Sequence, residues 1–128
     1  MSIGPYNGWT GEERMATLPI QRAAVRSGLL AKPSRCSICQ FVNADDPTGR
    51  NYVTFHSERY DRPLEVYETC YRDHGRLHMR FDRPGPWLRL VAEHGTNGTK
   101  WFEMLTMDPA SLSRPFHQTY PRGLPRPE

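Results

Sequence analysis

Three cysteines and two histidines are spaced in a way that is typical of a metal site. Cys36 and Cys39 form a C-x-x-C pair, and Cys70 is followed at intervals of four residues by His74 and His78. A tight turn within C-x-x-C lets two thiolates converge on one ion, and residues four apart on a helix share a face. Zn²⁺ prefers four tetrahedral sulfur and nitrogen ligands. We therefore predict a structural Zn²⁺ bound by Cys36, Cys39, Cys70 and His74.

The fourth ligand has alternatives. Asp73 and His56 could each replace His74, because carboxylates and imidazoles both bind zinc. The count of cysteines is odd, and this argues against a disulfide framework. The thiols are therefore expected to serve the metal.

The composition suits a fold that a metal helps to stabilise. Hydrophobic residues make up 37% of the 128 residues, proline occurs 12 times, and mean hydropathy is −0.74. We expect one α+β domain over 1–128 with a small core, to which a closed zinc site adds ~10 kcal/mol of folding free energy. No apolar run is long enough to span a membrane and no export signal is seen, so we expect a cytoplasmic protein without a membrane partner.

The residues before the first cysteine predict a helical segment over 10–28. Thr10 and Glu13 match a capping box at its start. Pro19 is expected to break or restart the helix, and Gly28 to end it.

The rest of the chain predicts short elements around a central zinc unit at 33–83. These are a strand at 51–55, an extended segment at 62–67, and helices at 71–80 and 87–94. A helical and aromatic segment follows at 84–112, with Asp108-Pro109 as a helix start, and a tail rich in Pro and Arg occupies 113–128. We expect four aromatic side chains to form a hydrophobic cluster over the zinc unit: Trp87, Trp101, Phe102 and Phe116.

Residues 36–81 together resemble a known family. The stretch CSICQFVNADDPTGRNYVTFHSERYDRPLEVYETCYRDHGRLHMRF is similar to the zinc-containing branch of the HNH (His-Me finger) endonucleases, built on a treble-clef ββα unit. Members show C-x-x-C, a His–His pair before a tyrosine, a Pro-Leu segment, and C-x-x-C-H-x-x-x-H. Matching positions here are His56, Tyr60, Pro63-Leu64, Cys70, His74 and His78.

The resemblance implies a treble-clef zinc core with flanking helices and chemistry on nucleic acid, with DNA as the expected partner. In such nucleases a strand histidine acts as general base, which would be His56 here. The last helix histidine, His78, would help to hold a second divalent ion, Mg²⁺ or Mn²⁺, that stabilises charge on the phosphate.

Two departures from the family pattern weigh against full activity. Phe55 and Ser57 flank His56, so the histidine pair is reduced to one, although Glu58 could substitute. Asp73 stands where the family often has a fourth cysteine. We therefore expect a zinc protein that binds nucleic acid with weakened or absent nuclease activity. An active HNH endonuclease using His56 and a zinc-stabilised protein-interaction module remain the alternatives.

Arginine supplies the basic charge. The formal net charge is +3, and Lys32 and Lys100 are the only lysines among 17 basic residues. Arg72, Arg76 and Arg80 recur every four residues and form a stripe that is expected to face away from the metal. This stripe could contact phosphates or simply be a solvated face.

Overall fold

The computed structural model describes residues 3–95, 100–105, 107 and 121–124, and these form two compact units. Unit 1 comprises Met1–Lys32, Ser57–Val66 and Ala110–Gly123, and unit 2 comprises Pro33–His56, Tyr67–Pro109 and Leu124–Glu128. The described residues contain three α-helices and one two-stranded antiparallel sheet, which confirms the α+β class. None of their helices combines the length and apolar character that crossing a membrane requires.

Helix α1 of unit 1 spans Gly11–Arg26 and begins as the sequence predicts. The Thr10 hydroxyl accepts a hydrogen bond from the Glu13 amide at 3.1 Å, and the Glu13 carboxylate accepts one from the Thr10 amide at 3.1 Å. Gly28 follows the helix with a φ of +81°, a left-handed conformation that glycine adopts without strain.

Pro19 does not interrupt α1, contrary to the expected break. The proline removes one backbone donor from the helix, and its side chain is exposed. The buried positions of α1 are Thr17, Gln21 and Ala24. The side-chain amide of Gln21 donates to the Ser57 hydroxyl at 3.0 Å and to the Pro63 carbonyl at 2.9 Å. Polar contacts therefore hold this helix within unit 1.

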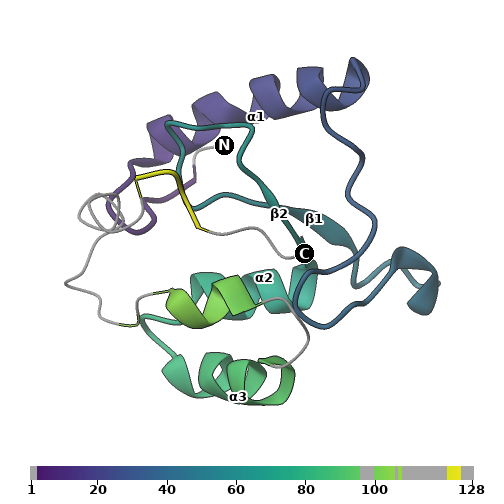
Figure 1. The fold of residues 1–128 in the computed structure, drawn as a ribbon, viewed down its shortest axis with the longest axis vertical. Helices are drawn as coiled ribbons and strands as arrows, with labels where there is room; N and C mark the ends of the chain where they lie inside the picture. The colour runs from purple at the N-terminus through teal and green to yellow at the C-terminus, as the bar shows by residue number, and fades with distance from the viewer. Residues whose placement is uncertain (1–2, 96–99, 106, 108–120, 125–128) are drawn as a thin grey trace. The chain divides into compact units, whose positions relative to one another are not determined.

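Unit 2 contains a short hairpin and two longer helices (Figure 1). Strands β1 (Val53–His56) and β2 (Tyr67–Cys70) pair in register from Val53↔Cys70 to His56↔Tyr67. The 3₁₀ turn η1 (Asn43–Asp45) precedes β1. Helix α2 (Tyr71–His78) follows β2 without a loop and packs against both strands and against α3 (Pro84–His94).

Aromatic side chains build much of the core of unit 2. The ring of Phe102, on the 3₁₀ turn η2 (Lys100–Met104), meets Trp87 at 5.9 Å and Trp101 at 6.0 Å in edge-to-face contacts. The Tyr67 ring stacks on Trp101 at 4.3 Å. The aromatic cluster is thus confirmed for three of its four expected members, whereas Phe116, the Asp108-Pro109 helix start and most of the tail lie outside the described residues.

Candidate metal centres

The C-x-x-C segment forms a tight knuckle next to β2. The Cys36 amide donates to the Phe41 carbonyl at 2.8 Å, and Gln40 adopts a left-handed φ of +66° that turns the chain back. The Ser37 amide donates to the Glu68 carbonyl at 2.8 Å. This last bond fixes the knuckle beside a strand that lies about thirty residues further along the chain.

Cys70 and Asp73 reach the knuckle from the start of α2. Cys70 ends β2 and is the N-cap of α2, where its sulfur accepts a hydrogen bond from the Asp73 amide at 3.5 Å. Cys70 therefore precedes the helix and is not part of the expected helical face with His74 and His78. Asp73, one turn into α2, has a fully buried side chain.

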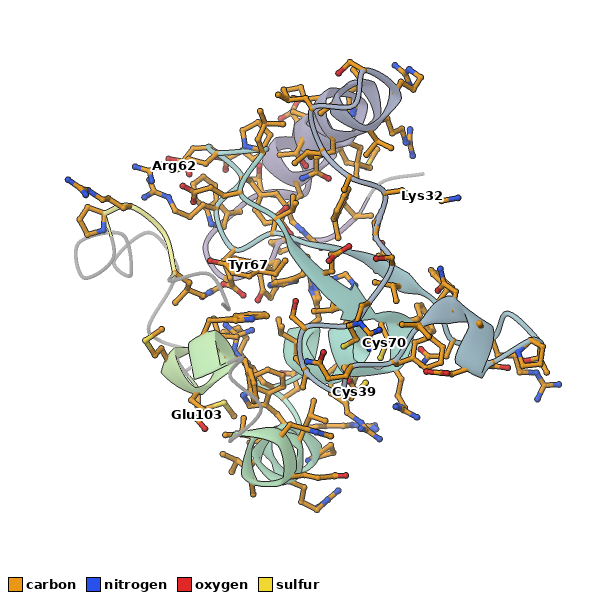
Figure 2. All side chains as sticks on the ribbon, turned by 45° about the vertical axis from the view of Figure 1, so that its right-hand side comes forward. Lys32, Cys39, Arg62, Tyr67, Cys70 and Glu103 are labelled. Atoms are coloured by element: carbon orange, nitrogen blue, oxygen red, sulfur yellow. The ribbon has the colours of Figure 1, made fainter. Side chains whose placement is uncertain are left out.

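Four side chains of types that can bind a metal meet at this junction of knuckle, strand and helix. One ligand atom from each of Cys36, Cys39, Cys70 and Asp73 lies within 4.8 Å of the others. The Cys39 and Cys70 sulfurs are 3.8 Å apart, and the Cys36 sulfur lies 3.5 Å from Asp73 Oδ2. Figure 2 labels Cys39 and Cys70 close to each other within unit 2. A tetrahedral zinc ion would separate two sulfurs by about 3.8 Å and a sulfur and an oxygen by about 3.6 Å. The spacing and the chemical types of these side chains thus fit Zn²⁺.

The local electrostatics differ between the thiols. Hydrogen bonds from the Cys36 and Cys39 thiols hold the pKa of the Cys70 thiol far below its usual range. Hydrogen bonding with the Cys36 and Cys70 sulfurs raises the pKa of the Cys39 thiol. Burial raises the pKa of the Asp73 carboxyl. Cys70 lies at the N-terminal end of α2, where a thiolate is favoured.

Two arginines of the predicted stripe turn toward this cluster instead of away from it. The guanidinium nitrogens of Arg72 and Arg76 lie 3.7 Å and 3.5 Å from Asp73 Oδ1, and Arg72 also lies 3.9 Å from the Cys39 sulfur. Asp73 Oδ1 thus meets two cations while Oδ2 faces the thiols. Arg80 is fully buried, so the expectation that it lies on an exposed face is wrong; its guanidinium sits 4.3 Å from the Phe81 ring centroid.

A second cluster joins the three histidines of β1 and α2. His74 Nε2 lies 3.0 Å from His56 Nδ1 and 2.9 Å from His78 Nε2. His56 is fully buried, and the two helix histidines, one turn apart, are partly exposed. His74 therefore groups with His56 and His78, and Asp73 takes the place beside the thiols that the sequence assigned to His74.

His74 Nε2 makes two close contacts that a single ring nitrogen cannot both satisfy as hydrogen bonds. One imidazole nitrogen has either one proton or one lone pair, so it makes one linear hydrogen bond and not two. Three nitrogens can instead direct their lone pairs at a single ion. Imidazole nitrogens are ligands of several divalent transition metals, so the three rings have the chemical types of a metal site.

Glu58 has a different environment. It belongs to unit 1 and is 3% exposed. Its carboxylate accepts hydrogen bonds from the Tyr6 hydroxyl and from the side-chain amide of Asn7 at 3.4 Å. Nearby, the Arg14 guanidinium donates to the Tyr60 hydroxyl at 3.2 Å. These contacts explain the burial of Glu58 as part of a hydrogen-bonded network in unit 1.

The sequence pattern therefore identifies the candidate metal ligands. The structure divides them into a cluster of three thiols with Asp73 and a cluster of three histidines. The pattern did not reveal the contacts of Arg72 and Arg76 with Asp73, although their i−1 and i+3 positions around an acidic residue could have suggested them. No model of a protein family matches the chain, and no significant match is found among curated proteins or among solved structures.

Proposed function

We propose that this chain is a zinc-stabilised protein that binds nucleic acid and hydrolyses its phosphodiester bonds at a three-histidine metal centre. The observation that carries the proposal is the convergence of the His56, His74 and His78 nitrogens beside a second, thiol-rich cluster. The knuckle, the hairpin and α2 occur in the order of a treble-clef unit, in agreement with the sequence resemblance to HNH endonucleases.

The structural ion of this proposal is Zn²⁺ held by three sulfurs and Asp73 Oδ2. Thiolate donors select zinc over magnesium or manganese, and four protein ligands leave no position open for a substrate. Three thiolates and one carboxylate leave a zinc complex with two excess negative charges. The guanidiniums of Arg72 and Arg76 offset those charges at Asp73, so the surroundings also suit an occupied site.

The histidine centre has the features of a reactive site. Three neutral ligands leave coordination positions open and leave the full charge of the ion in place. The three imidazoles would hold a divalent ion there, and such an ion would acidify a bound water molecule and stabilise the charge that develops on a phosphodiester. His56 is buried, whereas His74 and His78 are partly exposed to solvent. A substrate would therefore approach from the side of His74 and His78.

The grouping of His74 with His56 and His78 favours cleavage of nucleic acid over binding without cleavage. The sequence offers one strand histidine where the family has two, and this favoured a protein that binds without cleaving. His74 now accompanies His56 and His78 instead of the thiols, so the centre still has three ligands. Because an ion acidifies water itself, the missing second strand histidine does not remove the chemistry.

The test is plasmid nicking by purified protein with added Mn²⁺ or Mg²⁺. We expect His74→Ala and His78→Ala to reduce nicking about 100-fold or more, because a metal ion contributes several kcal/mol of charge stabilisation. His94→Ala is the matched control, since His94 lies on α3 and outside both clusters. Retained zinc would show that the variants are folded. Nicking that is absent in the wild type, or unchanged in both variants, would overturn the hydrolytic function.

A further inference from the structure

Unit 2 presents a pair of stacked tyrosines at its surface. The rings of Tyr52 and Tyr71 lie 5.2 Å apart with an interplanar angle of 23°, yet the residues are 45% and 57% exposed. The other stacked pair in the described part of the chain, Tyr67 with Trp101, is buried in the core. Core packing therefore accounts for that pair and not for Tyr52 and Tyr71.

The backbone holds the exposed pair in place. Tyr52 precedes β1 and Tyr71 follows β2, and the Tyr71 amide donates to the Tyr52 carbonyl at 2.7 Å. This bond continues the pairing of Val53 with Cys70 by one step. The two backbones are thus held together where the hairpin meets the first turn of a helix, and the rings stack on each other, so a ligand that stacks on them would find a preorganised surface.

Two exposed arginines lie close in sequence to the two tyrosines. Arg50 and Arg72 are both exposed, two residues before Tyr52 and one after Tyr71. The Arg72 amide donates to Asn51 Oδ1 at 3.0 Å, which ties the start of α2 to the segment that carries Arg50. The nearby Asp46 carboxylate accepts hydrogen bonds from the Thr48 and Asn51 amides and so holds the loop. Aromatic faces beside cations match a stacked base and its phosphates.

We propose that Tyr52 and Tyr71 form a platform on which an unpaired base stacks while the exposed Arg50 contacts a neighbouring phosphate. This inference rests on the proposed function and specifies it, because it makes single-stranded nucleic acid, or a single-stranded part of a duplex, the bound form. Tyr52 lies four residues before His56, which is about 14 Å along an extended strand. The same strand therefore links the platform to the histidine centre.

The test compares the affinities of purified protein for a labelled oligothymidine and a labelled duplex at low salt. We expect Tyr71→Leu to weaken oligothymidine binding about tenfold, because stacking on an aromatic ring is lost. Tyr71→Phe keeps the ring and should bind like the wild type. Leu88→Ala, which changes another exposed apolar side chain on α3, is the matched control. Oligouridine in place of oligothymidine distinguishes RNA from DNA.

The outcomes separate the two proposals. Wild-type protein that binds or nicks duplex, combined with equal oligothymidine affinity in Tyr71→Leu and Tyr52→Leu, would overturn the platform and leave the proposed function intact. Wild-type protein that binds neither nucleic acid would overturn both. Capture of a proline-rich peptide that depends on the tyrosines, without oligothymidine binding, would likewise reject the platform as a base-stacking surface.

Discussion

Asp73 and His74 are consecutive residues of α2, and their side chains belong to different clusters. Asp73 Oδ2 lies 3.5 Å from the Cys36 sulfur, whereas His74 Nε2 lies 3.0 Å from His56 Nδ1. One step along an α-helix turns the side-chain direction by about 100°. A single helix turn can therefore serve an anionic, sulfur-rich cluster and a neutral, nitrogen-rich cluster at the same time.

Substitutions of Asp73 test the fourth ligand of the thiol cluster. We expect Asp73→Asn to lower zinc affinity more than about 100-fold, because changes outside the ligand set alone cost 10- to 100-fold. Asp73→Cys should retain zinc, since a fourth thiolate also completes a tetrahedral set. Competition with a colorimetric chelator measures both affinities. If His74→Ala releases this zinc and Asp73→Asn does not, the assignment of Asp73 is wrong.

Removal of zinc is expected to unfold the protein. In Cys39→Ser a thiolate is lost, so we expect less than one zinc per chain and no cooperative thermal transition, because the apolar core is small. Ser37→Ala, within the same knuckle, is the control and should keep both. Elemental analysis and circular dichroism provide the measurements. Native stability of wild-type protein in excess chelator would instead show that the metal is dispensable.

The arginines beside Asp73 are expected to adjust metal affinity. Arg76→Ala removes a guanidinium 3.5 Å from Asp73 Oδ1, and we expect zinc affinity to fall about 10-fold, because the negative charge of the complex is less well balanced. Arg89→Ala, at an exposed position of α3, changes the net charge equally and should leave zinc affinity unchanged. Equal affinities for the two variants would reject a specific effect of Arg76.

The Tyr6–Glu58 contact is expected to stabilise unit 1. Tyr6→Phe removes a hydrogen bond to a buried carboxylate, and we expect the free energy of unfolding to fall by about 1–3 kcal/mol. Urea denaturation measures the change, with Tyr52→Phe as a control at an exposed ring. Zinc content should not change. A Glu58→Gln variant of full stability that has lost nicking would instead assign the catalytic role that the sequence allowed for Glu58.

The buried phenol of Tyr60 should make folding sensitive to alkaline pH. Burial raises its pKa above the ordinary value of about 10, so the folded state holds this proton more tightly than the unfolded state. The stabilising contribution is complete below about pH 10 and is lost as the pH rises through the folded pKa. Urea denaturation at several alkaline pH values should show a decline that is shallower in Tyr60→Phe. Identical pH profiles would contradict this role.

Local sequence signals predicted the elements well where the chemistry is local. Thr10 with Glu13 forms the expected cap of α1, and Gly28 follows the helix in a left-handed conformation. The spacing of Cys36 and Cys39 likewise anticipates a knuckle, because the turn depends on a few adjacent residues. Pro19 shows where a local rule fails. A proline inside a helix costs free energy at its own position, but α1 continues through Pro19 because the rest of the helix makes other contacts.

The sequence by itself determined which donors are available in residues 36–78: three thiols, three imidazoles and several carboxylates, among them Asp73. Only the tertiary structure decided how they are divided. Cys70 ends β2 and directly precedes α2, so the position where the strand ends sets the direction in which each side chain of α2 points. As a result, Asp73 lies with the thiols and His74 lies with His56. That position depends on strand pairing between Val53 and Cys70, a contact that spacing along the chain does not encode.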